Sequence, residues 1–464
     1  MSSATNSISI KSLYAIFKKS LSGENQDYTT GSIRKAILLL SIPMILEMCM
    51  ESVFAVVDIF FVGRVGKEAV ATVALTESVL TLVYSVAIGL SMAATAMVAR
   101  RIGEKKPEEA SRAAVQSIII ALVVTVAVSI IGFLAAPNIL QLMGAEKHVI
   151  ETGASYTRII FGGSIVIMML YLINGIFRGA GNASIAMWTL WIANGLNIIL
   201  CPILIHYYGV KGAAIATTVG RGAGVCFQLY HLFKGSGAVH ILRKYFSPDW
   251  EIIKSITNIA WAGTAQFLIG SASWIVLARI IAEFGSATVA GYQVAIRILL
   301  FFLLPAWGMS NATATLVGQN LGANQPERAE QSVWKTAKYN AIFMVFVTLL
   351  FLFASGPIVS FINPDPIVEK ISIQVLHVIT TGYIFYGVGM VLMNAFNGAG
   401  DTKTPTIISL FCFWGFQIPI AYFMAITFKL GPTGVFLAII IAETVITIVS
   451  FIIFRQGKWK KTKV

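Results

Sequence analysis

The sequence is poor in charged residues and in cysteine. Aspartate, glutamate, lysine and arginine make up only 12% of its 464 residues, about half of the usual share in a soluble domain. Its four cysteines lie in apolar stretches and form no CxxC pair, which argues against a disulfide scaffold or a cysteine-based metal site. Hydrophobic residues make up 57%, and the mean hydropathy is +0.79. These values exclude a soluble enzyme, a nucleic-acid-binding domain and a secreted disulfide-rich protein, and they indicate a membrane protein.

Histidine is scarce as well. A membrane enzyme would need a convergent set of His, Asp or Ser near one membrane face. The five histidines are scattered instead, at His148, His206, His231, His240 and His377. We therefore predict no enzymatic activity, no catalytic residues and no cofactor. His377, alone within a span, is interpreted as a packing residue.

Long apolar runs are what the sequence has in abundance. About 20 apolar residues suffice for a helix to cross the hydrocarbon core of a bilayer. Twelve runs of at least this length follow one another along the chain, at residues 36–62, 70–98, 113–138, 151–176, 186–207, 212–233, 252–282, 287–316, 337–361, 371–396, 405–428 and 432–454. The sequence therefore predicts an all-α integral membrane protein with twelve transmembrane helices. A shorter stretch at residues 12–21 is expected to form an amphipathic surface helix.

The basic residues are distributed unevenly between the loops. With the gaps between spans numbered alternately from the N-terminus, and the first three residues of each span counted with the gap before it, one set holds 24 of the 34 lysines and arginines and the other holds 6. The remaining four lie within spans: Arg158, Arg221, Arg279 and Arg297. Because loops rich in lysine and arginine usually face the cytoplasm, we expect a multi-pass protein of the inner (plasma) membrane with both termini cytoplasmic. The basic excess reflects topology, so no nucleic-acid partner is predicted.

The second half of the sequence repeats the first. The tripeptide GAG at residues 179–181 recurs at 398–400, 219 residues later. The same offset relates Gly66 to Gly285, Gly89 to Gly308, Gly103 to Gly322 and Pro107 to Pro326, and an offset of 222 relates GVKGAAIA from Gly209 to GPTGVFLA from Gly431. We therefore divide the chain into an N-terminal segment (1–35), a first lobe (36–233), a cytoplasmic linker (234–251), a second lobe (252–454) and a basic tail (455–464).

Duplicated halves of six spans each enter the membrane in the same orientation. They are then related by a pseudo-two-fold axis along the membrane normal. Two bundles joined by one linker can rock against each other and expose a cleft first to one face and then to the other. This architecture favours a transporter that works by alternating access, with its substrate in the cleft between the lobes.

Three carboxylates lie on one face of the first span. At 100° per residue, Glu47, Glu51 and Asp58 fall within about 40° of one another. Because a charge in the bilayer is costly, this face is expected to contact protein or water rather than lipid. We assign a coupling-ion role to Glu51 and Asp58, and a structural role, either at the interface or as a hydrogen-bonded acid, to Glu47.

Other ionisable residues within the spans receive weaker assignments. Glu77 in the second span is a further candidate partner of the coupling site, whereas Glu443 in the last span is isolated and is interpreted as structural. Three arginines are candidates to neutralise the carboxylates: Arg158, Arg279 and Arg297. Arg279 also has the i,i+4 spacing to Glu283 that is typical of a local ion pair.

Six sequence strings resemble the multidrug and toxic compound extrusion (MATE) transporters. They occur in order over roughly residues 34–455: VDIFFVGRVG from Val57, RGAGNA from Arg178, NIILCP from Asn197, GVKGAAIAT from Gly209, AGYQVAIRI from Ala290 and NGAGDTKTP from Asn397. The resemblance implies two six-helix lobes and a cation-coupled antiporter of organic, usually cationic or amphipathic, compounds. The expected partners are small organic substrates and the lipid bilayer.

The resemblance also implies a polar site in the first lobe. The family's first-helix aspartate falls on Asp58. The site would then include Tyr156 and Asn174 in the fourth span, Asn197 in the fifth, and a threonine in the sixth at Thr217, with Thr218 as the alternative. The coupling ion would be H⁺ or Na⁺, and no other metal is expected than Na⁺ at Asp58.

The sequence departs from the family pattern at three positions. Many relatives carry a second aspartate where this chain has Cys201, and Glu51 is a candidate to replace its charge. The acids of a sodium site in the second lobe are replaced by Gly270 and Tyr386. These departures favour H⁺ over Na⁺ and a coupling site in the first lobe.

Other functions remain open on the same scaffold. A lipid-linked oligosaccharide flippase has similar helical lobes, and an exporter of a narrow class of metabolites or peptides would share the same architecture. The sequence does not name the substrate. We expect the protein to act as a monomer.

Overall fold

The structure is a computed structural model that describes residues 10–23, 26–235, 237–363 and 365–464. The described residues form helices and loops and contain no β-strand. The helices are α1 (Ile10–Leu21), α2 (Ile33–Gly63), α3 (Lys67–Gly103), α4 (Pro107–Leu142), α5 (Lys147–Gly162), α6 (Ser164–Gly179), α7 (Ala183–Tyr208), α8 (Val210–Lys234), α9 (Trp250–Ala282), α10 (Ser286–Gly322), α11 (Pro326–Ile362), α12 (Pro366–Thr380), α13 (Tyr383–Ala399), α14 (Lys403–Ser409), α15 (Ile418–Tyr422) and α16 (Pro432–Arg455).

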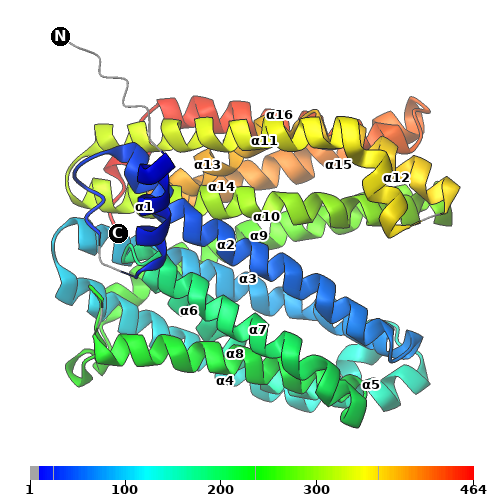
Figure 1. Cartoon of the computed structure of the whole chain (residues 1–464), viewed down its shortest axis with the longest axis horizontal. Helices are drawn as coiled ribbons and strands as arrows, with labels where there is room; N and C mark the ends of the chain where they lie inside the picture. The colour runs from blue at the N-terminus through cyan, green and yellow to red at the C-terminus, as the bar shows by residue number, and fades with distance from the viewer. Residues whose placement is uncertain (1–9, 24–25, 236, 364) are drawn as a thin grey trace.

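The long helices run side by side along the long axis of the molecule (Figure 1). Among the described helices, nine segments are long and apolar enough to cross a membrane, and the bent pair α12–α13 makes a tenth. The long helices α2 and α8 pack among them and bring the number of membrane-length segments to twelve. The predicted all-α, twelve-span architecture is confirmed.

Three predicted spans are not simple α-helices. The fourth is broken into α5 and α6 at Gly163, and the tenth is bent by 56° between α12 and α13. The eleventh contains two π-helical stretches, Leu410–Gln417 and Phe423–Thr427, which flank α15. Hydropathy reports the length of an apolar run but not its hydrogen-bond register, so these breaks were not predicted.

The sequence repeat extends to the backbone geometry. Helices α3 and α10 are both 37 residues long, and α4 and α11 each begin with a proline at the first position. The turns before these prolines contain Lys105 and Asn324, two of the three described non-glycine residues with positive φ. Lys105 and Asn324 are themselves 219 residues apart. Equivalent positions in the two halves therefore adopt the same unusual turn, which supports duplication.

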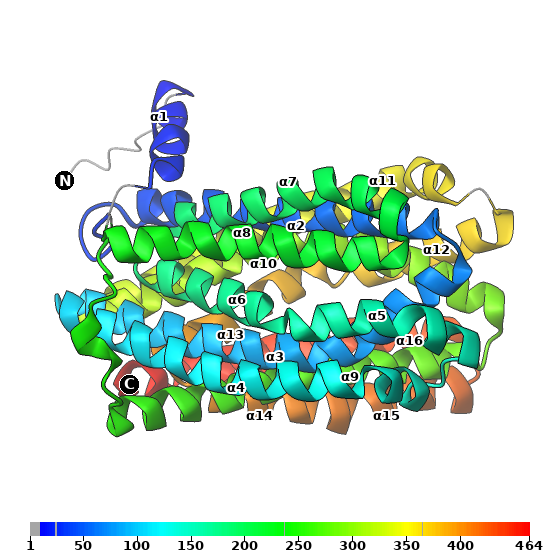
Figure 2. The same cartoon turned by 90° about the horizontal axis from the view of Figure 1, so that it is seen from below.

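We call α2 to α8 the N-lobe and α9 to α16 the C-lobe. We call the end of the molecule that carries both described termini the basic end; it lies at the left of Figure 1. Helix α1 lies there, across the direction of the long helices, and projects from the bundle (Figure 2). The expected short helix near residues 12–21 is confirmed. Its exposed Tyr14 and Phe17 are suited to the surface of a bilayer.

The two lobes touch at closely packed glycines toward the basic end. A Cβ atom on Gly103 would overlap the main chain of Gln319, and one on Gly322 would overlap the main chain of Arg100. Gly89 lies equally close to α9, and Gly308 lies against the main chain of Met44. Small residues allow helices to approach closely in a membrane. Two of the glycine pairs that identify the repeat, Gly103 with Gly322 and Gly89 with Gly308, therefore lie at the contact between the lobes.

Both described terminal segments bridge the two lobes at the basic end. In the N-terminal segment, Asp27 accepts a hydrogen bond from Lys105 of the N-lobe at 2.8 Å. The C-lobe residue Arg328 donates to the main-chain oxygens of Tyr28, Thr30 and Gly31. At the other terminus, Arg100 and Arg101 of α3 donate to the main-chain oxygens of Thr462 and Val464.

Asp27 is expected to stabilise this bridge over the physiological pH range. Partial burial raises its pKa, but hydrogen bonds from Lys105 and Thr29 outweigh burial and lower the pKa from 3.8 to about 2. A lowered folded-state pKa gives a stabilisation that is present above pH 4 and is lost as the pH falls toward 2. Asp27→Asn should therefore lower the thermal unfolding temperature slightly and equally at pH 6 and pH 8, since the pair is partly exposed.

The measurement is the difference in unfolding temperature between wild type and Asp27→Asn, taken in detergent at pH 8, 6 and 3. The difference should shrink at pH 3. A difference that grows on acidification would contradict the assigned ion pair.

Candidate functional site

The three carboxylates of α2 face the inside of the N-lobe, as expected from their helical spacing. The Glu47 side chain is 1% exposed and Asp58 is 9% exposed. Between them along the helix, the Glu51 side chain is 20% exposed. Eleven residues separate Glu47 from Asp58, which places them about 16 Å apart along the helix axis. They consequently belong to different layers of polar contacts.

Glu47 forms the layer nearest the basic end. Its Oε1 atom accepts hydrogen bonds from Asn174 Nδ2 and Arg178 Nη1, both at 3.2 Å. Asn174 in turn accepts a hydrogen bond from Gln228 Nε2 at 2.6 Å, and Arg178 donates to Ser91. This network joins α2, α3, α6 and α8. It supports the structural role predicted for Glu47 and, of the two alternatives, excludes exposure at the membrane interface.

Glu51 and Arg221 form the middle layer. Glu51 Oε2 accepts a hydrogen bond from Asn194 Nδ2 at 2.9 Å, and Glu51 Oε1 lies 3.8 Å from Arg221 Nη2. The Arg221 guanidinium is buried and also lies over the rings of Phe54 and Tyr84, at 5.8 and 5.6 Å from their centroids. A buried guanidinium thus stands beside one carboxylate and two aromatic faces.

Asp58 forms the layer farthest from the basic end. Its Oδ1 atom lies 3.9 Å from the Sγ atom of Cys201, which is fully buried. Asp58 also interacts electrostatically with Arg221 and with Glu77. Cys201 is the position at which the sequence lacks an expected aspartate. An aspartate there would place a second carboxylate beside Asp58, so the substitution changes the charge of this layer directly.

The structure brings most of the other predicted site residues to the middle layer and to the layer farthest from the basic end. Asn197 Nδ2 donates to Thr217 Oγ1 at 3.0 Å, one helical turn from Cys201 and from Arg221 respectively. Tyr156 is buried and interacts electrostatically with Asp58 and Glu77. Asn174 is the exception, because its contacts are with Glu47 and Gln228 in the layer nearest the basic end.

The arginines proposed to neutralise the carboxylates are not the ones that do so. Arg158 and Arg297 are exposed, and Arg279 forms its ion pair with Glu283 at 3.4 Å. The predicted Arg279–Glu283 pair is confirmed. Among the described residues, the ion pairs to the α2 carboxylates come from Arg178 and Arg221.

One of these two partners, Arg221, could be recognised from the sequence. Arg221 was recognised as an arginine within a span, where an ionisable side chain is a functional candidate by default. Arg178 lies outside the fourth predicted span, 151–176, because helix α6 extends farther than the apolar run, to Gly179. The sequence does not show which carboxylate of α2 either arginine contacts, since these contacts depend on the packing of α6 and α8 against α2.

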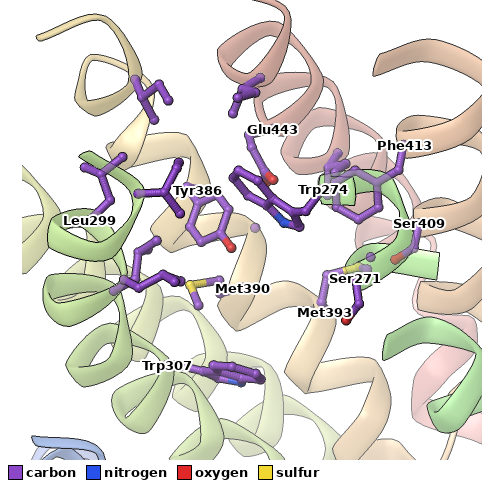
Figure 3. A pocket seen from close by; sticks show the side chains of 18 of the residues that line it. Ser271, Trp274, Leu299, Trp307, Tyr386, Met390, Met393, Ser409, Phe413 and Glu443 are labelled. Carbon is purple, nitrogen blue, oxygen red and sulfur yellow. The ribbon is translucent and has the colours of Figure 1, made fainter. Parts of the chain in front are cut away.

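A second feature is a cavity of about 600 Å³ in the C-lobe. Apart from Met92 of α3, its described lining residues come from α9, α10, α12, α13, α14, α16, the π-helical segment around Phe413 and the turn at Gly382. Figure 3 shows Glu443, Trp274, Tyr386 and Trp307 pointing into it from four helices. Gly270 and Tyr386, the positions at which the acids of a second-lobe sodium site are missing, both line this cavity.

Glu443 is the only charged residue among those that line the cavity. It is 9% exposed, and its carboxylate has no ion pair or hydrogen bond within the described ranges. The structural role assigned to Glu443 from the sequence stays a prediction. The cavity beside it was not predicted, because its aromatic and aliphatic walls have the composition of ordinary helix packing.

The two features offer different chemistry. The N-lobe layers hold carboxylates, one buried arginine and polar amides within reach of one another, which suits the binding of a proton or a small cation. The C-lobe cavity is large, apolar and aromatic, which suits an organic molecule of drug size.

Comparison with known proteins places the chain in a known family. The sequence model of a family described as MatE matches residues 43–203 and 264–423. A probable multidrug resistance protein, NorM, of Thermotoga maritima is 26% identical, over 97% of each chain. The multidrug export protein MepA of Staphylococcus aureus is 22% identical over 92% of this chain and 94% of its own length.

Solved structures are similar over nearly the whole chain. The outward-facing structure of a multidrug resistance MATE family transporter of the MOP superfamily covers 94% of this chain and 98% of its own. The two share 30% sequence identity and a TM-score of 0.88.

Proposed function

Because the chain belongs to the MatE family of multidrug and toxic compound extrusion transporters, we propose that it exports organic compounds in exchange for H⁺ or Na⁺. The family consists of membrane transport proteins rather than enzymes. The observation that carries the proposal is the buried Asp58 beside Cys201 and within electrostatic reach of Arg221. The names of the similar proteins support multidrug export.

We propose that the coupling ion binds at Asp58. Among the described residues, the side-chain hydrogen-bond donor to its Oδ1 atom is a thiol, whereas Na⁺, as a hard cation, prefers several oxygen ligands. This favours H⁺. Asn197, Thr217 and Tyr156 then serve as polar neighbours of the site, and Glu51 supplies a second carboxylate for the same arginine.

Arg221 links ion binding to a change in the N-lobe. It interacts with Asp58 and with Glu51, so protonation of Asp58 weakens one attraction and leaves Glu51 as the main partner. A shift of Arg221 would change the packing of α8 against α2. Coupling requires only that the ion bind one conformation better than the other.

Alternating access would open and close the contact between the lobes. The glycine contacts close the basic end, which we propose is cytoplasmic because it carries most of the lysines and arginines. We further propose that the protein resides in the inner (plasma) membrane. We also propose that it acts as a monomer.

The test is transport by purified protein in liposomes loaded with a fluorescent organic cation such as ethidium. A proton gradient and a sodium gradient are imposed separately. We expect ethidium movement with the proton gradient, and a reduction to the level of empty liposomes in Asp58→Asn, because an amide cannot take up the proton.

Glu369→Gln serves as the matched control, since Glu369 is a carboxylate on the C-lobe surface that accepts a hydrogen bond from Ser360. It should transport like wild type. Undiminished transport by a folded Asp58→Asn would exclude Asp58 as the coupling residue. No movement of several organic cations by folded wild type would shift the assignment to a flippase or a narrow metabolite exporter.

A further inference from the structure

We infer that the C-lobe cavity is a binding site for a lipophilic organic monocation and that Glu443 is its counter-charge. The inference rests on the proposed function and adds to it a place for the substrate, separate from the coupling ion. It assigns to Glu443 a role in substrate specificity rather than in ion coupling.

Glu443 lacks the partners that buried charges normally have. The buried Glu47 of the N-lobe has an arginine and an asparagine, whereas the Glu443 carboxylate has no such contact among the described residues. A buried carboxylate without a counter-charge is unfavourable. A cation in the adjoining cavity would supply the missing charge at the one acidic position on its wall.

The walls of the cavity suit the rest of such a ligand. Trp274, Trp307 and Tyr386 point into the cavity from α9, α10 and α13 (Figure 3). Aromatic faces attract cations, and the attraction is stronger where water is excluded. Met390 and Met393 also line the cavity and can adapt to ligands of different shape.

The size of the cavity limits the ligand to one of drug size. A volume of about 600 Å³ lies in the middle of the range for small-molecule sites. The described lining residues include no lysine, arginine or histidine, so a positive ligand meets no like charge from them. Because the described wall carries a single carboxylate, a ligand with a single positive charge would neutralise it.

The cavity and the coupling site lie in different lobes. Among the described residues, Met92 of α3 is the only N-lobe residue in the cavity wall. It lies close to Gly263 of α9, beside the contact between Gly89 and α9. Substrate bound in the cavity would therefore contact α3 at the lobe interface, whereas the proton binds at Asp58 on α2.

The test measures equilibrium binding without any ion gradient. Tetraphenylphosphonium is titrated into wild type and into Glu443→Gln in detergent by isothermal calorimetry. Triphenylphosphine oxide, which is apolar and uncharged, is titrated in parallel. We expect Glu443→Gln to lose at least tenfold in affinity for tetraphenylphosphonium and to bind the uncharged compound as wild type does. Glu369→Gln is the matched carboxylate control and should bind both like wild type.

Several results would overturn the inference. They are equal affinity of wild type and folded Glu443→Gln for tetraphenylphosphonium, an equal loss for both compounds, or no binding of tetraphenylphosphonium by wild type. These results would leave the role of Asp58 in gradient-driven transport untouched. Conversely, a failure of coupling at Asp58 would leave the binding result standing.

A measurement on wild type covers the case in which Glu443→Gln does not fold. Dicyclohexylcarbodiimide adds to a carboxylic acid in an apolar environment, and the product retains all atoms of both reactants as an N-acylurea. Modification of the peptide that contains Glu443 is followed by mass spectrometry. Saturating tetraphenylphosphonium should prevent it, and unchanged modification would contradict the inference.

Discussion

Replacing Arg221 with methionine is expected to abolish export and to destabilise the protein. The substitution keeps a side chain of similar length but removes the buried positive charge between Glu51, Asp58 and two aromatic rings. Removing one partner of a buried ion pair typically costs about 3 to 5 kcal/mol. We expect a loss of stability at the lower end of this range, since Glu51 keeps its hydrogen bond from Asn194 and is partly exposed.

A double-substitution cycle separates charge from packing. The variant Arg221→Met with Glu51→Gln should recover much of the thermal stability, measured in detergent by the fraction of protein that remains monodisperse after heating, because the unpaired carboxylate is gone. Export should not recover, since Arg221 no longer responds to Asp58. Arg158→Met is the matched control, as this arginine of the same lobe is exposed, and it should behave as wild type. Wild-type export by Arg221→Met would refute the proposed coupling.

Replacing Gly103 with valine is expected to reduce export at least tenfold. The added Cβ would overlap the main chain of Gln319 across the lobe interface, and main-chain atoms cannot move aside as a flexible side chain can. The lobes would then be held apart at the basic end. A transporter that must close this end in one half of its cycle would lose that conformation.

The conformational effect can be measured directly. Glu108 and Glu327 are exposed and are related by the repeat. Spin labels at these two positions, in a variant without the native cysteines, report the separation of the lobes by pulsed electron paramagnetic resonance. Gly103→Val should increase the distance. Gly356→Val is the control, because a Cβ at Gly356 meets nothing within 4 Å. An unchanged distance in Gly103→Val with normal export would show that this contact does not restrict the lobes.

Much of the fold was predictable because it depends on local patterns. Length and hydropathy identify each span, and a constant offset between glycines identifies the repeat. The spacing of Glu47, Glu51 and Asp58 placed them on one protected face of α2, since helical periodicity alone decides which residues share a face.

The partners of these carboxylates were not predictable in the same way. Arg178 and Arg221 are 131 and 170 residues from Glu47 and Glu51 respectively, so their contacts depend on how α6 and α8 pack against α2. The cavity beside Glu443 left no sequence signal either, because an unfilled space between helices does not alter the residues that surround it. Cys201 was recognised as a departure, and only the fold shows it next to Asp58.

The glycine contacts between the lobes also imply how a single six-helix unit would pair with a copy of itself. Gly103 meets Gln319 while Gly322 meets Arg100, and each of these contacts becomes the other when 219 is added to the N-lobe number and subtracted from the C-lobe number. In a two-fold symmetric dimer, residue i of one subunit contacts residue j of the other, and j contacts i. A single six-helix unit carrying these glycines would therefore pair with a second copy of itself through the same surface.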